Sequence, residues 1–371
     1  MSPSSEHNGS FLGILSFRRY QIVSMDVQQE QQLQELEYFQ NHVSERFSEF
    51  ISPSPPPSDP LLSIPWLRSL LHVFTSCETE FKEVLLTTAQ ISRTPSLEKV
   101  LTETLDRIVK ALDICNAVVN GIESVKQSRR LAEIAVTALK QRPLCSGSVR
   151  RARRALTSLL TGGSNADAKD KSSSRRRTTS RSWSFGQRGN VNVSKNWSAG
   201  KQIQAMAANL VLPRGAEASG HAMMPVYIMN SVMVLVMWVL VAAVPCQTSS
   251  VPVAPLQLPK HQSWASAALN VQERVGEEVK RKEKRFGGLM EEMQRMESIG
   301  LSLVEFTERF RFPAEEEDEG EVEEKVDEMD EICRRMEVGL EDLQRQVRAV
   351  FQRLVRIRLE IVSVLDQAPA I

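Results

Sequence analysis

The stretch from Met223 to Cys246, MMPVYIMNSVMVLVMWVLVAAVPC, constrains the fold of this chain more than any other. Between Pro225 and Pro245 lie 19 residues without a charged side chain. As a helix they would extend about 28 Å, close to the ~30 Å hydrocarbon core of a membrane. A helix that is apolar all round must be buried in lipid or in protein. The two possibilities describe different proteins, because a membrane span would separate the chain before it from the chain after it.

Other features of this stretch point in both directions. Asn230 and Ser231 lie near one end, where headgroups or water would satisfy them, and Tyr227 and Trp238 are compatible with a membrane interface. Against a span, the uninterrupted apolar run is only Val232 to Val244, and the flanking basic residues give no clear orientation. We favour membrane insertion or tight membrane association; a central core helix is the open alternative, and a short re-entrant or interfacial helix lies between the two. The residues of the candidate membrane segment are Val226, Val232, Leu235, Trp238, Leu240 and Val244.

Apolar residues recur every three or four positions through the N-terminal part, as in amphipathic helices that bury one face. Strand patterns are almost absent. The prolines of SPSPPPSDP end the first of these apolar stripes, the rows of apolar residues along one side of a predicted helix. Thr94-Pro95-Ser96 precedes the third stripe. Gly121 inside the third stripe is a candidate bend, since glycine in a helix costs about 1 kcal/mol relative to alanine. We therefore predict a flexible N-terminus at 1–25 and an antiparallel helical bundle at 26–160.

The composition then becomes basic. From Lys126 to Arg188 the chain has 16 Lys and Arg but 3 Asp and Glu. A stretch like 161–192 cannot bury enough apolar surface to offset its chain entropy, so we predict that it is disordered, within a basic Ser/Arg-rich linker at 161–221. A solvated linker is the plain interpretation, and an anionic membrane patch, a nuclear localisation signal and an RNA contact are the alternatives; no aromatic-interleaved pattern supports the last. The candidate contacts with an anionic membrane are Arg175, Arg176, Arg177 and Arg181, and the candidate phosphosites, whose phosphates would weaken that attraction, are Thr178, Ser180 and Ser182.

The C-terminal part predicts a pair of long helices. After the hydrophobic helix at 222–246 and a proline-rich linker at 247–264, two helical segments occupy 265–368, and the last has an unbroken heptad stripe from Met336 to Val364. The acidic RFPAEEEDEGEVEEKVDEMDE between them is most simply a solvated turn, although it could dock on the basic linker or repel an anionic membrane. The predicted fold class is all-α: a helical bundle with long antiparallel coiled-coil-like C-terminal helices, one hydrophobic helix that is a candidate transmembrane segment, and a disordered basic linker.

The sequence has no pattern typical of a catalytic or metal site. Its five cysteines lie far apart without CxxC, its five histidines are scattered, and GxSxG, P-loop and HExxH motifs are absent. We predict no catalytic, cofactor-binding or metal-binding residue and no small-molecule substrate. The cysteine pattern indicates reduced thiols in a cytosolic compartment, and the N-terminus does not have the pattern of a secretory signal.

Several long segments in order resemble a known family. They are LSFRR followed by QIVSMD, then EFKEVLLTTAQISRTP, KALDICNAVVNGIE, VRRARRAL, RSWSFG and SKNWSAGKQIQAMAANLVLPRG. Together they resemble the plant BYPASS-related and ROH-like proteins over nearly the whole chain. The resemblance implies a non-enzymatic, all-helical plant protein. ROH-like members bind an exocyst subunit of the Exo-seventy type, whereas BYPASS-type members control a root-derived mobile signal that restrains shoot growth.

The resemblance carries over no catalytic or interface residue, and the acidic turn and the length of the basic linker depart from the family pattern. We expect an adaptor or regulator of exocytosis that binds an Exo-seventy-type subunit at the cytosolic face of the plasma membrane or of secretory vesicles, with a cytosolic pool. The main alternative is a BYPASS-like regulator of root-to-shoot signalling that acts without exocyst. A nuclear RNA-associated role is a more distant one.

Overall fold

The computed structural model describes residues 11–52, 59–91, 94–161, 197–213, 218–246, 256–282, 288–310 and 316–366. These residues form nine helices and no strand, which confirms the all-α prediction. In chain order the helices are α1 (Phe11–Ile51), α2 (Ile64–Ile91), α3 (Pro95–Leu139), α4 (Ser146–Leu160), α5 (Ala199–Ala207), α6 (Ala218–Ala243), α7 (Ser263–Lys282), α8 (Glu291–Arg309) and α9 (Glu316–Asp366).

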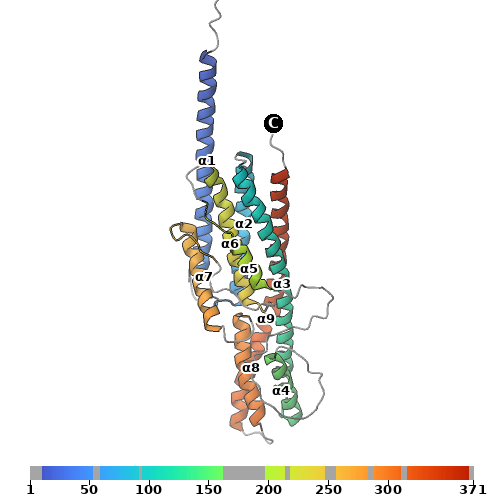
Figure 1. The fold of residues 1–371 in the computed structure, drawn as a ribbon. Helices are drawn as coiled ribbons and strands as arrows, with labels where there is room; N and C mark the ends of the chain where they lie inside the picture. Colours follow the sequence, from blue (N-terminus) through green and yellow to red (C-terminus); the bar gives the residue numbers. More distant parts are fainter. Residues whose placement is uncertain are drawn as a thin grey trace, which may run out of the picture.

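The helices pack side by side in an elongated bundle (Figure 1). The two longest, α3 with 45 residues and α9 with 51, run along most of its length. At one end of the bundle α1, α2, α5 and α7 lie around α6, and at the other end α4 and α8 lie beside α3 and α9 (Figure 1). The N-terminal part of α1 extends beyond the other helices (Figure 1).

Local sequence signals explain where two of these helices begin. The Thr94 side-chain oxygen accepts a hydrogen bond from the Leu97 N–H at 3.2 Å, and Pro95 occupies the first turn of α3, where its missing N–H leaves no hydrogen bond unmade. Ser63 caps α2 in the same way by accepting from the Trp66 N–H at 3.3 Å.

The apolar stripes of the sequence face the interior. In α1, Phe39, Val43 and Phe47 are fully buried. The heptad stripe of α9 is buried from Met336 to Ile361, against α2, α3 and α8 of the same chain. Its apolar residues therefore find their partners within the chain.

The structure differs from the expected boundaries at three places. α1 begins at Phe11, inside the range expected to be flexible, and α5 lies inside 161–221, the range expected to be linker. The described part of the first C-terminal segment is two helices, α7, which ends at Lys282, and α8, which begins at Glu291. The N-terminal and C-terminal halves also do not form separate units: α1 packs on α7, α3 on α9 and α4 on α8, since the apolar stripes of the two halves cover each other.

Candidate functional site

The apolar helix α6 is enclosed by protein. Met223–Ala243 is long and apolar enough to cross a membrane by length and composition, yet it is buried from Pro225 to Ala243, and Met223 and Met224 are half-buried. Its neighbours are α1, α2, α3, α5 and α7. The residues of the candidate membrane segment have no more than 1% of their surface exposed, namely Val226, Val232, Leu235, Trp238, Leu240 and Val244. The surface that lipid would contact is therefore covered by helices from both halves of the chain.

The polar residues of α6 have protein neighbours instead of headgroups. The Asn230 side-chain amide donates to the Thr104 hydroxyl of α3 at 2.8 Å, and that hydroxyl donates to the Val100 carbonyl. The Tyr227 and Trp264 rings pack in a T-shaped arrangement, with ring centroids 6.0 Å apart. Only one side of the Asn230 amide is satisfied, because its Oδ1 is buried without a hydrogen-bond partner. The end of α6 expected at a membrane interface thus lies inside the protein.

The C-terminal end of α6 is held by the segment that precedes α8. The Leu289 and Met290 N–H groups donate to the Ala242 and Ala243 carbonyls, both at 2.9 Å. A helix end leaves its last carbonyls without partners inside the helix, and these two bonds supply partners from elsewhere in the chain. A Cβ on Gly288 would lie 2.2 Å from the Ala243 oxygen, so a side chain at this position cannot be accommodated without backbone movement.

Gly121 of α3 lies in close contact with the same end of α6, on the other side. A Cβ at this position would lie 2.6 Å from the Val244 Cγ1 and 2.9 Å from the Pro245 oxygen. Gly121 does not split its helix, since α3 is one helix from Pro95 to Leu139. The glycine instead lets α3 approach the end of α6 closely.

A buried carboxylate links this junction to α2. Glu292, 6% exposed, accepts the Ile64 N–H at the start of α2 through its Oε1 at 2.9 Å, while the neighbouring Glu291 N–H donates to the Leu62 carbonyl at 3.3 Å. Burial raises the pKa of Glu292, and the Ile64 N–H partly offsets that rise. The chain at Leu62 takes a left-handed conformation, with φ of 63°. Residues from three distant parts of the sequence therefore meet at the end of α6.

A charged seam joins α3 to α9. The Lys126 Nζ lies 2.6 Å from the Glu341 Oε1, and the Lys140 Nζ lies 3.0 Å from Asp327 and 2.6 Å from Asp330. The two helices run antiparallel, because the later position on the α3 side, Lys140, pairs with earlier positions of α9 than Lys126 does. Much of the acidic N-terminal half of α9 thus faces the basic C-terminal part of α3. The seam spans residues on both sides of α6 in the sequence, and only chain halves in the same compartment can form it.

The centre of the seam is a small polar network. Lys126 is 9% exposed and also donates to the Gln344 side-chain oxygen at 2.7 Å, and Gln344 donates to Glu123 at 2.6 Å. The bond from Gln344 is the main cause of the lowered pKa of Glu123, followed by the nearby Lys126. A desolvated ammonium like that of Lys126 is stable only when it is paired, which favours the register between the two helices that brings these partners to it.

A second buried cation holds α5 in place. Arg107 of α3 is 4% exposed and donates to the Met206 carbonyl at 3.1 Å and to the Asn209 carbonyl at 2.9 Å. The last carbonyls of a helix carry partial negative charge, so a guanidinium at this position satisfies them. No local pattern in the sequence predicts this contact, because its partners lie about one hundred positions away along the chain.

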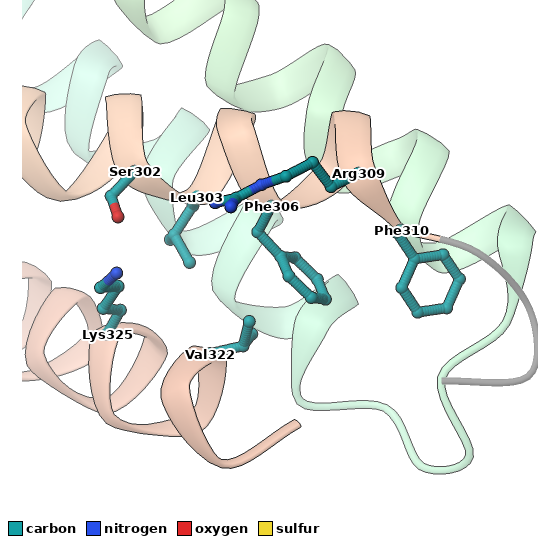
Figure 2. A pocket seen from close by; sticks show the side chains of 7 residues that line it. All are labelled: Ser302, Leu303, Phe306, Arg309, Phe310, Val322 and Lys325. Atoms are coloured by element: carbon teal, nitrogen blue, oxygen red, sulfur yellow. The ribbon is translucent and has the colours of Figure 1, made fainter. Parts of the chain in front are cut away.

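A small hollow lies between α8 and α9 (Figure 2). Its volume is about 160 Å³, below the ~300 Å³ at which small-molecule sites begin. Phe306 and Phe310 line it together with the cations Arg309 and Lys325 (Figure 2). The hollow is too small to enclose a cofactor.

The described residues contain no group of three or more His, Cys, Asp or Glu side chains that could hold a metal ion. His42 is a buried structural residue: its Nδ1 lies 2.8 Å from Glu80 and its Nε2 accepts from Arg46 at 3.4 Å. Burial, and then the nearby Arg46 charge, lower the pKa of His42, in agreement with a neutral ring that accepts at Nε2. This arrangement links α1 to α2 and leaves the ring no free nitrogen for proton transfer.

A family model described as Protein ROH1-like matches residues 2–365 of the chain. The chain belongs to the ROH1-like family. Two ROH1 proteins of Arabidopsis thaliana are similar to it. Protein ROH1A is 48% identical over 411 residues, which cover 99% of this chain and 98% of that protein. Protein ROH1D is 35% identical over 353 residues, which cover 88% of this chain and 87% of that protein. No solved structure matches the chain.

Membership of the ROH1-like family confirms the resemblance seen in the sequence. The linker residues singled out in this ROH1-like chain as membrane contacts or phosphosites lie outside the described residues, namely Arg175, Arg176, Arg177, Arg181, Thr178, Ser180 and Ser182. The predicted hydrophobic segment is described in full, and the structure places it at the centre of the bundle.

Proposed function

We propose that this ROH1-like chain is a non-enzymatic adaptor or regulator of exocytosis that binds an Exo-seventy-type exocyst subunit at the cytosolic face of the plasma membrane or of secretory vesicles. The partner class comes from the resemblance of the sequence to ROH-like proteins. The observation that carries the proposal is the joining of both chain halves into one helical body around α6. The outer surface of such a body consists of helix faces, which suit contact with a helical partner.

Membrane attachment is peripheral in this proposal. The apolar surface of α6 is already in contact with protein, and the seam between α3 and α9 requires both halves on one side of a membrane. Alkaline carbonate extraction of microsomes that contain the full-length protein tests this point. We expect release into the supernatant while an integral marker protein stays in the pellet; retention with the marker would contradict peripheral attachment.

Binding to the exocyst is tested by a pull-down of the full-length chain with each Exo-seventy-type paralogue, and with an exocyst subunit of another type as the control. We expect at least one paralogue to retain the chain and the control subunit not to retain it. Failure with every paralogue would remove exocyst from the proposal. In plants that lack the protein, a secretion defect supports the exocyst function, and long-range shoot arrest with normal secretion would support BYPASS-like signalling instead.

A further inference from the structure

α4 carries the most concentrated positive charge among the described residues. Its sequence, SGSVRRARRALTSLL, has four arginines within five positions and no acidic residue. The opposite side of the helix is anchored in the bundle by its apolar residues, and all four arginines are exposed. The anchoring residues are Val149, Ala152, Ala155, Leu156 and Leu159. α4 therefore presents a fixed basic surface.

Three of the four arginines have no acidic partner among the described residues. Arg153 pairs with Glu308 of α8 at 2.8 Å. Arg150, Arg151 and Arg154 form no ion pair with any described carboxylate, and we name these three the α4 arginine face. The neighbouring Lys140 and Arg142, in contrast, both pair with acids of α9. The acids at this end of the bundle thus leave the α4 arginine face unneutralised.

We propose that the α4 arginine face binds the headgroups of anionic phospholipids and thereby sets the orientation of the bundle on a membrane. Guanidinium groups bind phosphate oxygens through paired N–H donors, and each basic residue near an anionic leaflet adds to the attraction. The proposal deepens the peripheral membrane attachment proposed above, and it rests on that attachment.

The shape and composition of α4 favour a lipid surface over other polyanions. A single helix packed by one side is convex, so three cations spread over its outer side match a broad layer of charge better than they match a peptide in a groove. α4 has no aromatic side chain on which a base could stack, which disfavours single-stranded nucleic acid. The hollow between α8 and α9 does not include any α4 residue.

The helix is also held rigidly. Its first turn has a reciprocal capping arrangement, in which the Cys145 thiol accepts the Ser148 N–H at 3.4 Å and the Ser148 hydroxyl accepts the Cys145 N–H at 3.3 Å. The backbone of α4 packs against α3 on one side and against α8 on the other. Because the face is ordered before it binds, docking does not require a disordered segment to fold.

The test is co-sedimentation of the full-length protein with vesicles of phosphatidylcholine alone and of phosphatidylcholine mixed with phosphatidylserine. The variant Arg150→Gln/Arg151→Gln/Arg154→Gln removes the face. The control variant Arg348→Gln/Arg356→Gln/Arg358→Gln removes the same charge from exposed positions on α9. Circular dichroism before sedimentation checks that both variants keep the helical fold.

We expect the wild type to bind only the anionic vesicles, more weakly as salt rises. The face variant should lose roughly 100-fold in partition coefficient at low salt, since each basic residue contributes about fivefold. The control should stay close to wild type. The proposal would be overturned if both variants lost binding equally, if the face variant lost none, or if the wild type bound neutral vesicles. It would also be overturned if RNA, added at the same phosphate concentration as the lipid, displaced the protein from the vesicles.

Two further measurements separate this proposal from others. A variant with the linker residues Arg175, Arg176, Arg177 and Arg181 changed to Gln should keep a large share of vesicle binding. Complete loss, with the α4 face variant unaffected, would assign the contact to the linker and refute the α4 site.

The exocyst pull-down, done without lipid, should retain the α4 face variant. Loss of vesicle binding with the partner retained supports the α4 site, and a wild type that binds vesicles but no exocyst subunit refutes the exocyst function alone.

Discussion

Replacement of Gly121 by alanine distinguishes a protein-buried α6 from a free one by the sign of the stability change. In a helix without close neighbours, Gly→Ala stabilises by about 1 kcal/mol, because glycine loses more backbone entropy on folding. In this structure the added methyl would lie 2.6 Å from the Val244 Cγ1 and 2.9 Å from the Pro245 oxygen. Both distances are below van der Waals contact, and the second atom belongs to the backbone.

The magnitude follows from these two opposing effects. Overpacking of a close-packed interior costs up to about 3 kcal/mol, and the helix preference of alanine returns about 1 kcal/mol. We therefore expect Gly121→Ala to lower the free energy of unfolding by roughly 1–2 kcal/mol. The variant Gly320→Ala is the matched control, because a Cβ there meets nothing within 4 Å. It should be neutral or stabilise by up to about 1 kcal/mol.

Urea denaturation followed by circular dichroism and by tryptophan fluorescence, to which the buried Trp238 and Trp264 contribute, measures both variants. Adding Val244→Ala to Gly121→Ala should recover part of the loss, because it removes the nearer of the two clashing groups; the double-mutant cycle should thus give a favourable coupling. A Gly121→Ala protein as stable as the Gly320→Ala protein, or more stable than wild type, would refute the packing of α3 against the end of α6.

Three further predictions follow from individual residues. Cys145 is exposed, and hydrogen bonds from Ser148 lower its pKa, so mass spectrometry after brief iodoacetamide treatment should find it alkylated well before the other four cysteines, whose pKa values are raised by burial; equal rates would contradict this. Thr104→Val leaves the Asn230 amide unpaired and should cost about 1–3 kcal/mol of unfolding free energy, most of which Asn230→Leu in the same chain should restore; no recovery would show that the pair is not coupled. Burial raises the pKa of Glu292 above 4.5, so the folded state binds its proton more tightly than the unfolded state, and the stability that this gives is lost as pH rises from about 4.5 through the folded-state pKa. As pH rises through this range, the wild type should therefore lose stability relative to Glu292→Gln, whose unfolding free energy does not depend on this proton. A difference between the two proteins that stays constant with pH would show that Glu292 does not titrate with a raised pKa.

Much of the helical architecture could be predicted because helix periodicity is a local signal. The stripe from Met336 to Ile361 identified the buried side of α9 residue by residue, and Thr94 with Pro95 marked the start of α3. The environment of α6 could not be predicted in the same way. A helix buried in protein and a helix buried in lipid have the same composition, so the choice depends on the partners, which lie far away in the sequence.

The contacts at the end of α6 were missed for a related reason. A glycine such as Gly121 weakens a helix when its neighbours are unknown, and it permits close packing when a second helix lies beside it. Glu292 has no sequence pattern that marks it as the cap of α2, because its partner Ile64 is 228 positions away. Short-range patterns predict elements, whereas pairings between distant elements need the structure.

Zero-length cross-linking with a water-soluble carbodiimide in intact microsomes tests most directly whether both chain halves pack together around α6. The Lys126 Nζ and the Glu341 Oε1 are 2.6 Å apart, and Lys140 lies equally close to Asp330. We predict that mass spectrometry finds the Lys126–Glu341 amide within single chains, and that Lys126→Gln abolishes it. If α6 crossed the membrane, Lys126 and Glu341 would lie on opposite sides of it, and the absence of both cross-links from the wild-type chain would contradict a protein-buried α6.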